Sequence, residues 1–110
     1  PALAACPNQA ISHNWAVESG DQRVSGDYMT KLVAGRKVRL GNNQEHYRSN
    51  GRYSVRVNGQ TVNADSYRFY SDGSRCIGYD EPRFDLYVVQ NSQLILINMN
   101  GGRFAAQVTN

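Results

Sequence analysis

The sequence lacks the features that define several large protein classes. Its apolar runs are short, such as the "LILI" of residues 94–97, whereas a membrane-spanning helix needs about 20 apolar residues. No Asn-x-Ser/Thr sequon occurs among its eleven asparagines, so nothing indicates N-glycosylation. Charged residues make up 19% of the chain and hydrophobic residues 40%, a balance that argues against intrinsic disorder.

Motifs for metal and cofactor binding are missing as well. The sequence has only two histidines, and it contains no Cys-x-x-Cys, no His-Glu-x-x-His and no EF-hand loop. It also lacks a glycine-rich phosphate loop and the Gly-x-Ser-x-Gly elbow of many hydrolases. We therefore expect neither a metal nor a cofactor.

Lysine is scarce, because ten of the 12 basic residues are arginines. They face nine carboxylates, which leaves a net charge of +3. Nucleic-acid binders usually carry clustered positive charge, but here the arginines alternate with apolar residues along the chain. The composition therefore disfavours nucleic acid as a partner.

The two cysteines, Cys6 and Cys76, leave three possibilities open. A disulfide between them would suit a small exported protein and would add about 4 kcal/mol in the chain-entropy model. Alternatively, the "LAAC" of residues 3–6 resembles a bacterial lipobox, in which Cys6 carries a lipid. The third possibility is two free thiols in the cytosol. The first two predict a periplasmic or extracellular protein, either free or anchored to a membrane as a lipoprotein, and the "ALA" of residues 2–4 fits a signal-peptidase site.

Four dipeptides predict tight turns, namely Asn50-Gly51, Asn58-Gly59, Asp72-Gly73 and Asn100-Gly101. Such pairs favour the two-residue type I′ hairpin, because both central residues of that turn need a positive φ. Between the turns, apolar and polar residues alternate with the period of two that half-buried strands show. The pattern predicts about seven or eight short antiparallel strands.

These strands predict a mainly β fold, in which an antiparallel meander curls into a small lipocalin- or calycin-like barrel. The chain is expected to form one domain, residues 1–110, with an N-terminal arm over 1–26, a short helix over 27–35 and the meander over 36–108. Ser25 or Asp27 would cap the helix and Gly35 would end it. Trp15, in the arm, either plugs the core or belongs to an early strand.

Alternation also predicts which side chains face the barrel interior. In a wide barrel these side chains would form the wall of an apolar ligand pocket. They are Tyr53, Tyr67, Phe69, Phe84, Leu86 and Phe104.

Four segments carry a resemblance to a known group of proteins. They read "LVAGRKVRL", "YRSNGRYSV", "YRFYSDGSRCIGY" and "LILINMNGGRF", and over residues 27–108 they resemble small exported bacterial proteins with calycin-like barrels. The resemblance implies the barrel fold but no site, and many members of the group have no assigned function. Such proteins often carry a cysteine pair within the C-terminal strands, whereas only Cys76 lies there in this chain.

The segment "EHYR" at residues 45–48 offers the most reactive side chains. In a ribonuclease-like mechanism Glu45 or His46 would be the general base, His13 the acid, and Arg48 or Arg52 the clamp on the phosphate. However, a strand sends Glu45 and His46 to opposite faces. Whether the protein is an enzyme is therefore left open, with the pattern leaning against it.

Arginines also interleave with aromatic residues. Arg52, Arg56 and Arg68 would line one patch with Tyr70 if their strands pair in register. Such a patch suits an anionic sugar, a lipid head group or an acidic protein surface. The alternative is the solvated outer face of a barrel, where arginine stems cover apolar neighbours.

These observations together predict a non-enzymatic, exported binding module. Its partner would be a small apolar, amphipathic or anionic ligand, or a protein such as a hydrolase that it inhibits. The residues predicted to contact this partner are Tyr53, Tyr67, Phe69, Arg52, Arg56 and Arg68. One alternative is a small basic RNase-like hydrolase that uses His13, His46 and Glu45. Another is an envelope lipoprotein with a structural role, tethered through Cys6.

Overall fold

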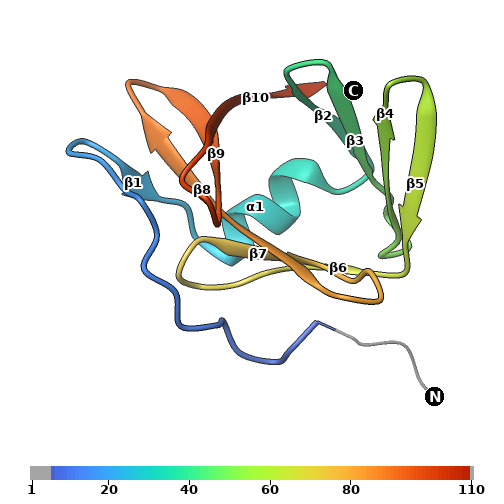
Figure 1. Cartoon of the computed structure of the whole chain (residues 1–110), viewed down its shortest axis with the longest axis horizontal. Helices are drawn as coiled ribbons and strands as arrows, with labels where there is room; N and C mark the ends of the chain where they lie inside the picture. The colour runs from blue at the N-terminus through green and yellow to red at the C-terminus, as the bar shows by residue number, and fades with distance from the viewer. Residues whose placement is uncertain (1–5, 110) are drawn as a thin grey trace.

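A computed structural model describes residues 6–109 (Figure 1). Nine strands lie side by side in the order β5-β4-β3-β2-β10-β9-β8-β7-β6, and every pairing is antiparallel. This sheet curls into a nearly closed barrel whose seam lies between β5 (Gln60–Ala64) and β6 (Tyr67–Phe69). The predicted antiparallel barrel with one short helix is confirmed, and its strand count is slightly higher than predicted.

The strands follow one another mostly as hairpins. The last strand, β10, pairs with both β9 and β2, and so joins the two halves of the meander. A further short strand in the N-terminal arm, β1, pairs with β8. The remaining bounds are β1 (Gln22–Arg23), β2 (Arg36–Leu40), β3 (Asn43–Tyr47), β4 (Tyr53–Val57), β7 (Ser74–Ile77), β8 (Arg83–Gln90), β9 (Gln93–Asn98) and β10 (Arg103–Thr109).

The tight turns occur where predicted, but most are of another type. Only Asn58-Gly59 has positive φ at both residues, 51° and 79°, as a type I′ turn requires. At the other three turns only the glycine is in this region, with φ of 90° at Gly51, 93° at Gly73 and 89° at Gly101. In each, the glycine N–H bonds to the carbonyl three residues earlier, which makes a three-residue loop with a glycine bulge. The prediction of type I′ turns is wrong there, because the loops contain one residue more.

The single helix, α1 (Gly26–Val33), forms for the predicted reason. Its N-cap is Ser25, whose Oγ accepts a hydrogen bond from the Tyr28 N–H at 3.3 Å. Glycine is required at the first helical position, because a Cβ on Gly26 would lie 2.7 Å from the carbonyl oxygen of Phe69 in β6. The helix therefore packs directly against the sheet.

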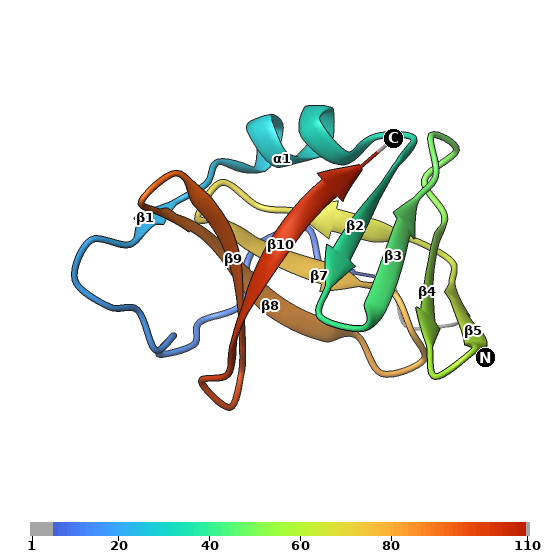
Figure 2. The same ribbon diagram turned by 90° about the horizontal axis from the view of Figure 1, so that it is seen from above.

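The helix closes one end of the barrel. Met29 and Val33 are fully buried on its inner side. Figures 1 and 2 show α1 across this end, whereas the tips of the β2–β3, β4–β5 and β9–β10 hairpins lie at the opposite end. The helix thus plugs one end of the barrel, and a hollow lined by residues of the hairpin tips lies at the other end.

The sheet carries a core on each of its faces. Inside the barrel a large cluster gathers helix side chains and residues of most strands. Outside, the N-terminal arm crosses the sheet and lays Trp15 on Leu86 and Val88 of β8 and on Ile97 of β9. Trp15 therefore neither plugs the barrel nor belongs to a strand.

The two faces of β8 are opposite to the prediction. Phe84 and Leu86 were expected inside the barrel, but they pack in the outer cluster with the arm. Asp85 and Tyr87 point inward instead and are fully buried. The prediction is wrong because β8 is largely apolar on both faces, so that its alternation does not distinguish inside from outside.

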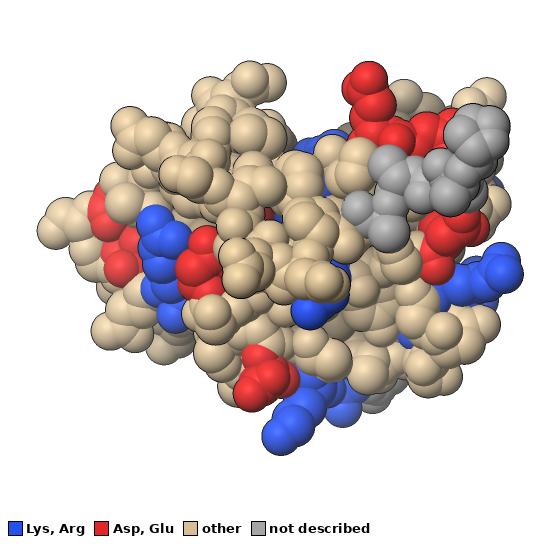
Figure 3. Space-filling view, turned by 90° about the horizontal axis from the view of Figure 1, so that it is seen from below, with Lys and Arg blue, Asp and Glu red and all other residues tan. Residues whose placement is uncertain are grey.

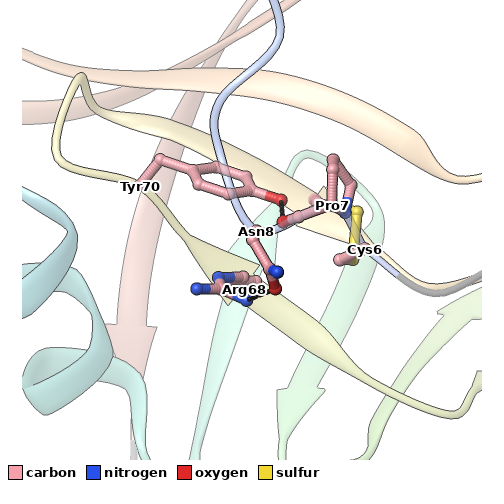
Figure 4. Close-up of a disulfide and its surroundings, with 6 residues drawn as sticks. Cys6, Pro7, Asn8, Arg68 and Tyr70 are labelled. Atoms are coloured by element: carbon pink, nitrogen blue, oxygen red, sulfur yellow. Dashed lines mark hydrogen bonds between the residues drawn. A yellow bond between two sulfur atoms is a disulfide. The ribbon is translucent and has the colours of Figure 1, made fainter.

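A disulfide between Cys6 and Cys76 ties the arm to the outer face of β7, with the two Cα atoms 5.8 Å apart (Figure 4). Beside it, the Tyr70 hydroxyl donates a hydrogen bond to the carbonyl of Pro7 at 2.6 Å. The predicted disulfide is confirmed. Because the Cys6 sulfur is bonded to Cys76, it does not carry the thioether lipid that the lipobox alternative requires in this form of the protein.

Candidate functional site at the open end of the barrel

The barrel interior holds a carboxylate, Glu45 of β3, that is only 2% exposed. Its Oε1 accepts hydrogen bonds from the hydroxyls of Tyr47 at 2.7 Å and Tyr87 at 3.3 Å. Its Oε2 accepts from the Tyr53 hydroxyl and from Nη1 of Arg75, both at 2.5 Å. Four donors from four different strands therefore surround this one carboxylate.

Arg75 of β7 links Glu45 to a second carboxylate. Its Nη2 bonds to Oδ2 of Asp85 at 2.6 Å, and Asp85 in turn accepts from Nε of Arg83 at 3.0 Å. The side chains of Arg75 and Asp85 are 2% and 0% exposed, whereas that of Arg83 is 54% exposed. Two arginines and two carboxylates thus form a balanced chain that runs from the barrel centre to solvent.

Burial fixes the protonation of the groups around Glu45. It raises the pKa of Tyr53 and Tyr87, and raises that of Tyr47 well above its usual value, although the charge of Arg75 acts in the opposite direction. Burial alone would lower the pKa of Arg75, but Glu45 and the neighbouring hydroxyls raise it well above its usual value. These tyrosines and Arg75 therefore remain hydrogen-bond donors throughout the physiological range.

A small cavity of about 80 Å³ adjoins this chain, lined by Glu45, Tyr53, Arg75, Tyr79 and Arg83 together with apolar side chains. A larger hollow of about 360 Å³ lies at the hairpin tips and shares several lining residues with the small cavity. The shared residues are Leu40, Asn43, Val57, Arg83 and Leu96. We call the small cavity the inner cavity and the larger hollow the mouth.

The mouth is mainly apolar and amide in character. Among the described residues that line it, Arg83 is the only charged one, and Asn42, Asn58 and Asn98 surround it. Phe104, predicted as core, stands at this rim instead and is 43% exposed. An arginine therefore lies between the mouth and the inner cavity.

Among the charged side chains of this site, the hydrogen-bonding capacity that remains is of one kind. All four oxygens of Glu45 and Asp85 accept hydrogen bonds from protein groups. Among residues 6–109, Nε of Arg75 has no partner, and Arg83 uses only its Nε and Nη2 for Asp85. The unused groups of the two arginines are donors, so a bound molecule would have to supply an acceptor.

The structure separates the residues predicted to bind a ligand. Tyr53 lines the inner cavity, whereas Phe69 is buried in the core and Tyr67 packs edge-on against Tyr47, with its hydroxyl bonded to the carbonyl of Arg48. All three side chains face the barrel interior, as the alternation of apolar and polar residues predicts. That they contact a ligand stays a prediction.

The predicted arginine patch requires strands that do not pair. Arg52 and Arg56 belong to the β4 region, and β4 pairs with β3 and β5, whereas Arg68 lies on β6, which pairs with β7. Arg68 instead bonds to Asn8 of the arm at 3.2 Å. On the face that the arm crosses, basic side chains are scattered rather than gathered (Figure 3). The register condition for a single patch is therefore not met.

The residues of the RNase-like alternative do not share a site. Glu45 points into the barrel, whereas His46, its neighbour on β3, lies between Lys37 and Ser54 on the other face. His13 belongs to the arm and packs edge-on against Trp15, with 4.5 Å between ring centroids. Partial burial, and then the charges of Arg48 and Lys37, lower the pKa of His46. The arrangement provides no shared base and acid.

The sequence pattern missed Arg75, Arg83 and Asp85. Arg75 lies in "SRCI", where an arginine among apolar residues is typical of an outward-facing position. Asp85 stands in "RFDLYVV", and a lone aspartate in such a strand also points to solvent by pattern. Only their pairing with each other, which depends on how β7 and β8 align, places them inside.

Searches against family models, curated proteins and solved structures return no match for this chain. Among residues 6–109, no group of three or more His, Cys, Asp or Glu side chains is arranged to hold a metal ion. None of the described helices has the length and apolarity needed to cross a membrane.

Proposed function

We propose that the protein is a non-enzymatic, exported binding module that takes a small amphipathic ligand at the mouth of its barrel. The observation that carries this proposal is the inner cavity, where the carboxylates are already satisfied and the unused groups of the charged side chains are arginine donors. The ligand would present a hydrogen-bond acceptor, such as a carboxylate, to Arg83, whose Nη1 is not used for Asp85. Bonds from arginine to such a group are among the stronger ones in proteins.

The volumes of the two cavities support a ligand with a polar head group and an apolar part. Binding pockets for small molecules usually measure about 300–1,000 Å³. The mouth, at about 360 Å³, falls within this range, whereas the inner cavity of about 80 Å³ has room for a head group alone. The ligand's apolar part would then lie at the mouth against Leu40, Val57, Leu96 and Phe104.

The disulfide supports the exported location. Disulfides persist in the periplasm and outside the cell, and they are rare in reducing compartments. Cys6 and Cys76 are both used in this bond.

The test is a titration of the ¹⁵N-labelled protein with octanoate, followed by the shifts of its backbone amides. We expect shifts at the hairpin tips that line the mouth, and weaker shifts with octanol or octylamine, because a carboxylate accepts two hydrogen bonds from arginine. Arg83→Gln should weaken octanoate binding by about tenfold. Arg39→Gln, which removes an exposed arginine of β2 outside the mouth, should leave it unchanged.

Two results would contradict the proposal. One is a set of shifts confined to the outer faces of β4 and β6, which would favour the arginines predicted from sequence. The other is the absence of any shift at the mouth at millimolar concentrations of all three probes.

A further inference from the structure

At the seam of the barrel the outer edges of β5 and β6 have no strand partner among the described residues, and α1 packs against β6. Strand β5 ends the strand order and pairs only with β4, so among residues 6–109 its second edge has no strand beside it. Natural proteins usually protect such an edge with charge, proline or a covering segment. β5 reads "QTVNA", with no charged residue and no proline, and all but its last residue are exposed. Its backbone groups are therefore available to an added strand.

A groove lies at the C-terminal end of this edge. After β7 the chain continues through residues 78–81, and the N–H of Gly78 bonds to the carbonyl of Ser66, which holds this segment beside the end of β5. The groove measures about 450 Å³ and is lined by residues 63–65 and 78–81. Three of these residues are acidic, namely Asp65, Asp80 and Glu81, and none is basic.

Val62 shows that an apolar position at the seam is uncovered. It lies opposite Val55 of β4, on the face that turns toward the barrel core. Even so, Val62 is 46% exposed, because no strand continues the sheet at this point. A segment laid along β5 would cover it.

We propose that the free edge of β5 receives an extended segment of a partner protein, in which basic side chains alternate with apolar ones. The segment adds a strand to the sheet, and its main chain bonds to the backbone of β5. One set of its side chains covers Val62, while its basic side chains meet Asp65, Asp80 and Glu81. Charge selects this occupant over a second copy of the chain, because a second β5 has no basic residue to offer the groove.

The probe is an acetylated, amidated hexapeptide of alternating lysine and valine. Titrated into the ¹⁵N-labelled protein at low salt, it should shift the amides of residues 60–65 and 78–81 and slow hydrogen exchange in β5. Raising the salt to about 0.5 M should weaken binding by about tenfold, because exposed charges are then screened. A hexapeptide of alternating glutamate and valine should not bind.

Two pairs of variants separate the strand edge from the charge. Val62→Lys should abolish binding, whereas Val17→Lys should not, since Val17 is equally exposed at 47% but lies in the arm. Asp80→Asn combined with Glu81→Gln should weaken binding severalfold, whereas Asp27→Asn on α1 should not. These substitutions are at exposed positions, and the far-ultraviolet circular dichroism of each should stay unchanged.

Three outcomes would overturn the proposal. The first is no shift in β5 up to about 5 mM peptide, a limit that corresponds to only about 3 kcal/mol of binding free energy. The second is equal binding of the lysine and glutamate peptides. The third is self-association of the protein through β5 without any peptide, which Val62→Lys would abolish and which would identify a second copy as the occupant.

Discussion

The two faces of β8 support two different kinds of core. Inside the barrel, Asp85 and Tyr87 belong to a chain of charges and hydroxyls in which nearly every polar atom is paired. On the outside, Leu86 and Val88 lie in a purely apolar cluster under Trp15. Neighbouring residues of one strand are thus stabilised by different forces.

The difference follows from what covers each face. The interior is enclosed by the sheet itself, so buried charges are held by rigid neighbours and can be paired with good geometry. The outer core is covered by an arm that has little regular structure of its own between residues 6 and 25. That cover depends on its attachments, which include the disulfide at Cys6, the ion pair of Asp21 with Arg103 and the pairing of β1 with β8.

The largest loss of stability is expected from a substitution in the barrel interior. Arg75→Leu leaves Glu45 and Asp85 without their shared cation, and it should lower the free energy of unfolding by about 3–5 kcal/mol. Urea denaturation measures this loss. Adding Glu45→Gln and Asp85→Asn to Arg75→Leu should recover part of the loss, because the stranded charges are then removed. A loss below about 1 kcal/mol in the single variant would show that the network does not hold the barrel together.

Removal of the disulfide should cause the second-largest loss of stability. Replacing both Cys6 and Cys76 by serine should lower the free energy of unfolding by about 2–4 kcal/mol, since the bond closes a long loop in the unfolded chain. Hydrogen exchange should then rise in the arm and at Leu86 and Val88, while the amides of β3 keep their protection. Equal loss of protection on both faces would contradict the division into two cores.

A smaller, pH-dependent effect is expected where the arm meets β10. Arg103 donates two hydrogen bonds to Asp21, and this contact lowers the pKa of Asp21 from 3.8 to about 2. A lowered carboxyl pKa stabilises the fold above pH 3.8 and ceases to do so as the pH falls toward 2. The contribution is about 1–2 kcal/mol. Asp21→Asn should therefore lower stability at pH 6 but not at pH 2, whereas an equal loss at both would exclude the ion pair as its cause.

The smallest effect concerns a single hydroxyl of the interior. Tyr87→Phe removes the 3.3 Å bond to Glu45, and Glu45 keeps its three other donors. We expect a loss of about 1 kcal/mol in urea denaturation. Tyr28→Phe on the exposed face of α1 is the matched control and should cost nothing measurable. A loss as large as that of Arg75→Leu would mean that the hydroxyl, rather than the ion pair, organises the interior.

Local signals in the sequence were sufficient to predict the barrel architecture. The cap at Ser25 and the glycine turns predicted where elements begin and end, because these signals act within a few residues. One turn carries no such signal: Asn91 and Ser92 both have positive φ, 52° and 65°, although no glycine marks the site. The hairpin pairing of β8 and β9 imposes that conformation.

The site depends on pairing between strands and was largely beyond a single sequence. The sequence points to Glu45 as a candidate catalytic base, whereas the structure places it at the centre of a buried network. Arg75 and Asp85 each follow the pattern of an outward-facing residue, and only the register of β7 against β8 shows that they meet inside the barrel. These two charged side chains face the interior, against the usual pattern, because they form a buried ion pair with each other.

A tyrosine titration tests most directly whether the polar groups of the interior are buried and paired. Seven tyrosines are present, and burial raises the pKa of Tyr47, Tyr53 and Tyr87 far above the ordinary value of 10. Ultraviolet absorbance of the native protein should therefore show these three still protonated at about pH 11, whereas all seven should ionise together in urea. Ionisation of all seven in the folded protein below that pH would contradict the account.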